Sequence, residues 1–183
     1  MKAKQSLMAS LIVLAMALTT VSCEYKKHVM IDDGTVTQIR PLKGFERIEI
    51  MGSPTVSYTQ ADSFSVRVEG PENLVSQILT DVEGHTLSIR NKGKIGILNI
   101  GIGNMKELAV HVSSPDLISV YVSGSGDFLS RHQVDTDQME IVLRGSGDID
   151  FDDIICDRCK TELVGSGDIK LNKLVSQASD VNL

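Results

Sequence analysis

The sequence predicts an all-β protein, a parallel β-helix-like solenoid in which each coil takes about 20 residues. The main observation is the tetrapeptide Gly-Ser-Gly-Asp, which occurs at 124–127, 145–148 and 165–168, so that successive copies start 21 and 20 residues apart. Between the copies, apolar and polar residues alternate and β-branched residues are common, a pattern typical of strands. Aromatic residues make up only 4% of the chain and tryptophan is absent, which predicts a core of Val, Ile and Leu side chains.

The first 23 residues predict export followed by a lipid anchor. Residues 1–22 have two early lysines, an apolar stretch over 7–18 and then small or polar residues, the order found in secretory signal peptides. The apolar stretch is shorter than the roughly 20 residues that a membrane-spanning helix needs. Residues 20–23, Thr-Val-Ser-Cys, resemble a bacterial lipobox, although a threonine stands where an aliphatic residue is usual. We expect lipidation of Cys23; the alternative is an ordinary signal peptide, cut near Ser22, that leaves a free thiol.

The mature chain is expected to contain one domain. Residues 23–40 are interpreted as the lipidated N-terminus and a polar tether, and 41–183 as the solenoid. Its first part is expected to contain a helical turn within 72–80 and short strands at 45–50, 55–58, 64–68, 85–90 and 106–112. Because Leu183 matches Leu163 in the register of the repeats, we expect the solenoid to be truncated where a further corner would be due.

The repeated tetrapeptides are predicted to form the corners of the coils. Glycine permits positive φ, and its lack of a side chain lets successive corners approach closely. The candidate corner residues are Gly124, Gly126, Asp127, Gly145, Gly147, Asp148, Gly165, Gly167 and Asp168. Stacked aspartates repel one another by roughly 1 kcal/mol in water at about 5 Å. We favour solvated aspartates that cap the corners through backbone N–H groups, and a bound cation is the alternative.

The acidic residues near the second corner and the histidines are further candidate sites of chemistry. Asp148, Asp150, Asp152 and Asp153 resemble the carboxylates of polysaccharide-cleaving β-helices, but a solvated strand edge is the simpler interpretation. Neither the histidine spacing nor the glycine corners, which lead into strands, indicate a metal or phosphate site, so no cofactor and no metal are expected.

Cys156 and Cys159 form a C-x-x-C motif within a region expected to be strand. In redox proteins this motif caps a helix, which lowers the pKa of one thiol. A corner disulfide is our first interpretation, followed by a pair of inert thiols and, last, redox catalysis. No second cysteine pair is present to complete a zinc site.

The lipobox, the opening strand at 45–50 and the serial Ser-Gly-Ser-Gly-Asp corners together resemble the family called putative auto-transporter adhesin, head GIN domain, of Bacteroidetes envelope proteins. The resemblance covers roughly residues 41–183. It implies a right-handed β-helix-like fold and an adhesin, with no catalytic residues to carry over. The chain differs from the family pattern in ending early and in having cysteines where the next coil has Ser176 and Ser179.

The sequence therefore predicts a non-catalytic outer-membrane lipoprotein for adhesion or binding, on a side of that membrane left open. Without residues 1–22 the chain has 16 basic and 24 acidic side chains, which argues against a nucleic-acid partner. The expected partners are the membrane, through the lipid, and an envelope protein or glycan, with self-association through the open solenoid end. The alternatives are a periplasmic scaffold and a carbohydrate-binding or carbohydrate-cleaving protein, although few aromatic residues are available as sugar platforms.

Overall fold

The computed structural model describes residues 29–32, 34–93 and 108–183, and most of these residues lie in strands. One short helix, α2 (Glu72–Val75), lies between the fifth and sixth strands. Two of the strands are long and bend around one side of the molecule, namely β10 (Asp127–Gly145) and β11 (Ile149–Gly165). The others are β1 (Val29–Asp32), β2 (Thr35–Arg40), β3 (Arg47–Gly52), β4 (Thr55–Gln60), β5 (Ser65–Gly70), β6 (Ile78–Glu83), β7 (Thr86–Asn91), β8 (Ala109–Ser114), β9 (Ser119–Gly124), β12 (Ile169–Leu171) and β13 (Leu174–Asn182).

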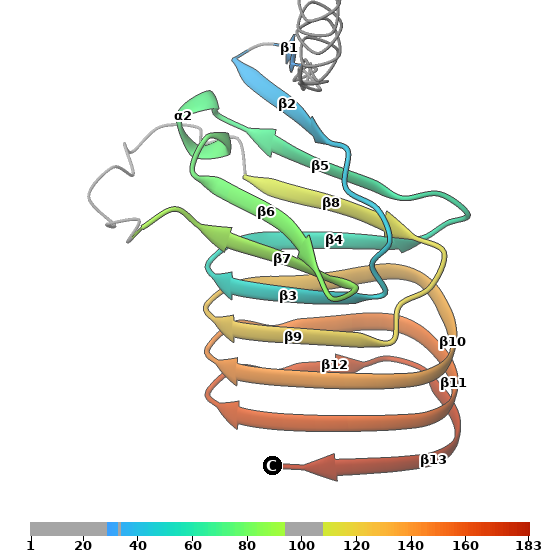
Figure 1. The fold of residues 1–183 in the computed structure, drawn as a ribbon. Helices are drawn as coiled ribbons and strands as arrows, with labels where there is room; N and C mark the ends of the chain where they lie inside the picture. Colours follow the sequence, from blue (N-terminus) through green and yellow to red (C-terminus); the bar gives the residue numbers. More distant parts are fainter. Residues whose placement is uncertain (1–28, 33, 94–107) are drawn as a thin grey trace, which may run out of the picture.

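The described strands form one sheet that folds over on itself into two facing layers (Figure 1). One layer contains β6, β7, β3, β9 and the second halves of β10 and β11. The other contains β1, β2, β5, β8, β4 and the first halves of β10 and β11. The long strand β10 joins the layers, because it pairs with β4 over 127–130 and with β9 over 140–145. The sheet is therefore continuous and nearly closed around a core.

The right-handed parallel β-helix solenoid expected from the repeats is wrong for this fold. The sheet is mixed, since the pairs β1–β2, β2–β5, β5–β8 and β6–β7 are antiparallel. At β6–β7 the cause is local: Gly84 and His85 have φ of +55° and +65°, as in a two-residue hairpin turn. The protein is all-β, but its architecture is a nearly closed, barrel-like sheet of parallel and antiparallel strands. Within the range expected to be a tether, β1 and β2 pair with each other and β2 pairs with β5.

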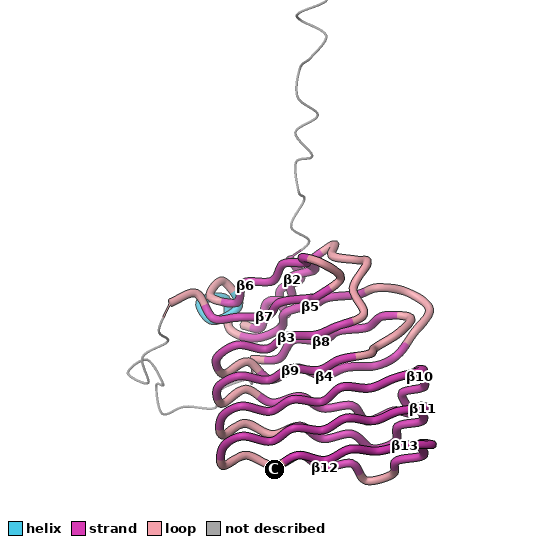
Figure 2. The backbone as a smooth tube through the Cα atoms, turned by 60° about the horizontal axis from the view of Figure 1, so that its bottom comes forward, coloured by secondary structure: helices cyan, strands magenta, loops and turns pink. Residues whose placement is uncertain are grey.

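The repeated tetrapeptides stack at one side of the molecule (Figure 2). Gly124, Gly145 and Gly165 lie opposite one another in the parallel pairs and all have positive φ. A Cβ atom on Gly145 would overlap the carbonyl oxygen of Gly124, and one on Gly165 would overlap that of Gly145. The same carbonyl of Gly124 accepts a 2.8 Å hydrogen bond from the N–H of Ser146. Glycine is thus required at these corners by both backbone conformation and close approach.

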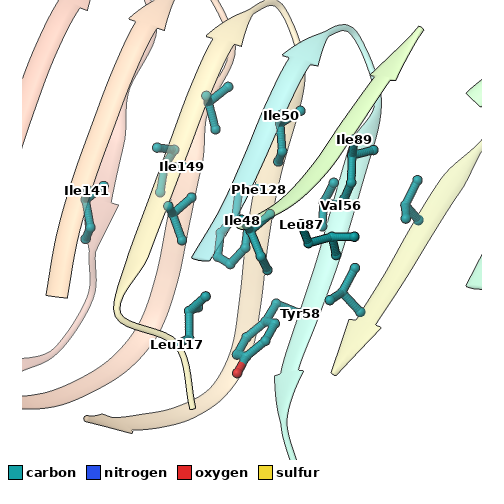
Figure 3. Packing of buried hydrophobic residues seen from close by; sticks show 14 of the residues in the cluster. Ile48, Ile50, Val56, Tyr58, Leu87, Ile89, Leu117, Phe128, Ile141 and Ile149 are labelled. Atoms are coloured by element: carbon teal, nitrogen blue, oxygen red, sulfur yellow. The ribbon is translucent and has the colours of Figure 1, made fainter. Parts of the chain in front are cut away.

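The inward side chains stack in columns that run from coil to coil. Ile48, Val120 and Ile141 are opposite one another in one layer, and all three are fully or almost fully buried. In the facing layer, the rings of Phe128 and Phe151 lie 5.0 Å apart between centroids. Figure 3 shows Ile48 and Phe128 among the side chains that fill the space between the layers. The core is therefore mainly aliphatic, with a few aromatic rings among the aliphatic side chains.

The corner stack yields a stability prediction that separates close approach from backbone strain. A Cβ on Gly147 would overlap the carbonyl oxygen of Gly126, and Gly147 has no positive φ. Gly44 has φ +78° and open space around an added Cβ. We expect Gly147→Ala to lower the free energy of unfolding by about 3 kcal/mol through overpacking, and Gly44→Ala by only about 1 kcal/mol through the left-handed backbone. Urea denaturation followed by circular dichroism measures both, and an unchanged midpoint for Gly147→Ala would contradict the prediction.

Candidate functional site

The outer face of β3, β7 and β9, with β6 beside it, contains a groove with a cavity volume of about 570 Å³. Along β3 and β9, buried and partly exposed residues alternate, so that every second side chain points out of the sheet and into the groove. We call this the outer groove. Its lining comprises the acidic side chains Glu49, Asp81 and Glu83, the basic Arg47 and Arg90, the hydroxyl-bearing Thr86, Ser88, Ser119 and Tyr121, and the apolar Ile48 and Met51.

The register of the sheet brings residues from distant parts of the chain together in the outer groove. Glu49 of β3 lies opposite Ser88 of β7 on one side and Tyr121 of β9 on the other. Two residues before Glu49, Arg47 lies opposite Ser119. A second hollow of about 290 Å³, lined partly by β10 and β11, adjoins the groove and shares Arg47 and Ser119 with it. The two hollows therefore lie side by side across neighbouring strands.

Ion pairs use only part of the charge in the outer groove. Arg90 Nη1 lies 2.7 Å from Asp81 Oδ2, and Arg47 Nη1 lies 3.1 Å from Oε1 of Glu46. All four side chains are 39–47% exposed, and exposed pairs of this kind contribute little to stability. Glu49 forms no ion pair with any other described residue. The groove thus presents both hydrogen-bond donors and acceptors that a ligand can reach.

Cross-strand pairs continue beside the groove. Lys160 Nζ donates to Glu140 Oε1 at 2.8 Å, and Arg144 Nη2 donates to Glu162 Oε1 at 2.8 Å. The hydrogen bond to Glu140 raises the pKa of Lys160, and the bond to Glu162 raises that of Arg144. Both cations are therefore charged throughout the physiological pH range, and each links one coil to the next.

The repeated aspartates bind the backbone of the following corner. Asp127 Oδ1 accepts a 3.0 Å hydrogen bond from the N–H of Asp148, and Asp148 Oδ1 accepts one of 3.0 Å from the N–H of Asp168. Asp148 is partly exposed and Asp168 is exposed. Among the residues that the structure describes, no three His, Cys, Asp or Glu side chains are placed to hold a metal ion. The aspartates therefore form a ladder of hydrogen bonds that links successive corners.

The acidic residues near the second corner are held by cations and amides of neighbouring coils. Arg131 Nη1 lies 2.8 Å from Asp150 Oδ2 and 3.1 Å from Asp152 Oδ1. Lys173 Nζ lies 2.8 Å from Asp153 Oδ2. Each of these carboxylates thus has a partner that joins two coils, which is a structural arrangement rather than the open acid and base pair of a glycosidase.

The sequence profile of the family described as putative auto-transporter adhesin, head GIN domain, matches residues 44–181. The chain belongs to this family. The resemblance inferred from the repeated corners is thereby confirmed. The description names an adhesin rather than an enzyme, and it indicates a cell-envelope or surface location for the head GIN family. No curated protein matches the chain significantly.

Solved structures share the fold of this head GIN domain. A putative adhesin from Bacteroides fragilis has 24% identity and a TM-score of 0.68 over 81% of this chain and 66% of its own. A putative lipid binding protein from Parabacteroides distasonis has 25% identity and a TM-score of 0.66 over 79% of this chain and 61% of its own. A putative adhesin from Parabacteroides distasonis has 17% identity and a TM-score of 0.56 over 81% of this chain and 70% of its own. The chain thus spans less than two thirds of the length of the first two.

The predicted anchor of this head GIN protein lies outside the described residues. Cys23 and the export segment fall within residues 1–28, so lipidation stays a prediction. In the part of the chain that the structure describes, no helix has both the length and the apolar character needed to cross a membrane.

The C-x-x-C motif lies in β11, and both of its side chains are buried thiols. Cys156 is 6% exposed and Cys159 is 3% exposed, and Cys156 is opposite Thr136 and Ser176 in the sheet. Burial raises the pKa of Cys156 to about 11 and also raises that of Cys159. A thiol with a raised pKa is a poor nucleophile at neutral pH, which argues against redox catalysis. The disulfide stays a prediction.

Two features were missed by the sequence analysis. Gly52, with φ +101°, lies opposite Gly124 and forms a further corner, which the sequence Gly52-Ser53 could have indicated. The outer groove was not predicted either, because Glu49, Ser88 and Tyr121 become neighbours only through the strand register. No local motif in the sequence indicates that they meet.

The buried thiols lead to a prediction about reactivity. With Cys23→Ala, we expect the two remaining thiols to react with Ellman's reagent at pH 8 on the order of 100-fold more slowly in the native protein than in denaturant. Since the folded pKa of Cys156 is raised to about 11, the native state binds more protons between about pH 8.5 and 11, and stability should fall as the pH rises through that window. Denatured protein that shows no thiol without a reductant would instead demonstrate the disulfide.

Proposed function

We propose that this protein is a non-catalytic binding lipoprotein of the outer membrane, held by acyl chains on Cys23, that presents the outer groove to a protein or glycan of the envelope. The observation that carries the proposal is the groove itself, about 570 Å³ in volume and built by side chains of β6, β7, β3 and β9. Its volume lies within the range of ligand sites in proteins. Self-association stays a further prediction; among the described strands, β12 and β13 each pair with β11 alone.

Binding fits the described residues better than catalysis does. The carboxylates near the second corner are occupied by Arg131 and Lys173. The carboxylates of the groove come from Glu49 of β3 and from β6, where Asp81 is paired with Arg90. Such pairing holds the side chains in place and leaves their hydrogen-bonding atoms at the surface, which suits recognition.

The chemistry of the outer groove also bears on the class of ligand. One solved structure of the same fold, from Parabacteroides distasonis, is called a putative lipid binding protein. In this chain, nine of the eleven groove residues carry a charge or a hydroxyl group. An acyl chain needs an enclosed apolar pocket, whereas this groove is open and carries five charged side chains, so a partner with both polar and apolar surface fits it better.

The anchor is proposed from the sequence of residues 1–23. A single acyl chain gives only marginal membrane binding, and each buried methylene contributes about 0.8 kcal/mol, so several chains on Cys23 would hold the domain on the membrane. The groove would then lie close to the membrane surface, where the anchored domain can encounter envelope partners.

The proposal is tested by whole-cell labelling with and without permeabilisation, in cells fed a clickable fatty acid. We expect the wild-type protein to carry the fatty acid and to be labelled on intact cells. Cys23→Ala should lose the fatty acid, whereas the control Cys159→Ser should keep it.

Two other outcomes would change the proposal. Acylation with labelling only after permeabilisation would move the role to a periplasmic scaffold. Absence of acylation in the wild-type protein would remove the anchor.

A further inference from the structure

The outer groove and the adjoining hollow together form a site long enough for a chain-like ligand. The outward residues of β6, β7, β3, β9, β10 and β11 contribute to it. Neighbouring strands lie about 4.8 Å apart, so the six strands that line the two hollows span roughly 24 Å of the sheet. An extended polymer that crosses the strands would contact every one of them.

Tyr121 is the aromatic side chain that the groove presents. It is partly exposed in the middle of the face, opposite Glu49 on β3 and Val142 on β10. By contrast, Tyr58 and Phe128 are fully buried in the core. An aromatic ring that combines a flat apolar face with a polar edge suits a partner that has both apolar C–H faces and hydroxyl groups.

The other polar groups around Tyr121 match hydroxyl groups. Glu49 accepts hydrogen bonds, Arg47 donates them, and Ser119 can do either. Ser88 is buried, and its Oγ accepts a 3.4 Å hydrogen bond from Arg90 Nη1. A sugar hydroxyl also donates and accepts, so it can be satisfied by Glu49, Arg47 or Ser119. The mixed charge of the groove is therefore compatible with a hydroxyl-rich ligand and needs no strongly charged one.

Other classes of polymer fit this face less well. Peptides often bind by adding a strand to an open sheet edge. Among the described strands, β7, β3 and β9 each pair on both sides, and the open edge beside the groove belongs to β6. A peptide added there would lie along β6 at the border of the groove and would not cross β7, β3 and β9. A phosphate backbone would meet the carboxylates of Glu49, Asp81 and Glu83.

We propose that the outer groove binds a saccharide chain, with a sugar ring on Tyr121 and sugar hydroxyl groups hydrogen-bonded to Glu49, Arg47 and Ser119. The inference rests on the proposed function, because it names the ligand class of the same surface. It identifies the glycan, rather than the protein, as the envelope partner.

The test uses the full protein in detergent micelles and immobilised envelope preparations of the producing bacterium. Part of each preparation is treated with periodate, which cleaves sugar diols, and part with protease. We expect periodate to abolish binding and protease to leave it. Defined oligosaccharides of neutral hexoses, N-acetylhexosamines and uronic acids then serve as competitors.

Variants at Tyr121 connect the glycan to the groove. Tyr121→Ala should weaken binding by about tenfold or more, since loss of a stacking ring costs roughly 1.4 kcal/mol at that ratio. Tyr121→Phe keeps the ring and should stay within about threefold of wild type. Lys173→Gln, outside the groove, is the matched control, and a thermal melt by circular dichroism checks that each variant is folded.

Three other outcomes would contradict the ligand class, the position of the site or the binding function. Binding that resists periodate but is lost with protease would overturn the saccharide and leave the proposed binding function. Binding that is lost with periodate but unchanged in folded Tyr121→Ala would overturn the groove as the saccharide site. Absence of binding to every preparation would overturn both the saccharide and the proposed function.

Discussion

The close approach of glycine corners is the constraint on which the rest of the structure depends. Gly124, Gly145 and Gly165 lie so near one another that a Cβ atom would overlap the carbonyl oxygen of the preceding corner. The same carbonyls accept hydrogen bonds of 2.8 Å from Ser146 and Ser166. Because each corner fixes the position of the next, the strands that leave the corners are held in parallel register. Register then decides which side chains form columns in the core and which form rows on the outside.

The outward rows show how charged side chains are arranged on neighbouring coils. The aspartate ladder places like charges on successive coils, which costs roughly 1 kcal/mol in water at about 5 Å. Each Oδ1 of Asp127 and Asp148 offsets part of this cost by accepting an N–H from the next corner. Elsewhere the rows alternate in sign, as in the pair Lys160 and Glu140. Individually such exposed pairs contribute little, but they favour the correct register over a shifted one.

The sequence predicts the repeated half of the molecule far better than the first half. The spacings of 21 and 20 residues equal the offsets at which Leu143 pairs with Val122 and Leu163, because a repeat can stack on itself in one register only. The first half has no such repeat. There β5 pairs with β8 through residues such as Val66 and Val112, which are 46 positions apart in the sequence, and the hairpin of β6 and β7 depends on positive φ at Gly84 and His85. Alternating patterns reveal strands of this kind but not their direction or their neighbours.

One strand of the outer groove, β6, lies outside the parallel pairing that joins β7, β3 and β9. In the repeated coils, outward charges on adjacent strands are paired, as Arg144 is with Glu162, and the surface is a regular series of bridges. The antiparallel strand β6 instead adds Asp81 and Glu83 beside β7, and these carboxylates contribute to the groove around Glu49 and Tyr121. A hairpin at the end of a regular stack can change its side chains without disturbing the corners beneath it. The hairpin of β6 and β7 therefore interrupts the repeat at the proposed binding surface, where it adds side chains that the repeat does not supply. The stacked glycine corners give this surface a rigid support.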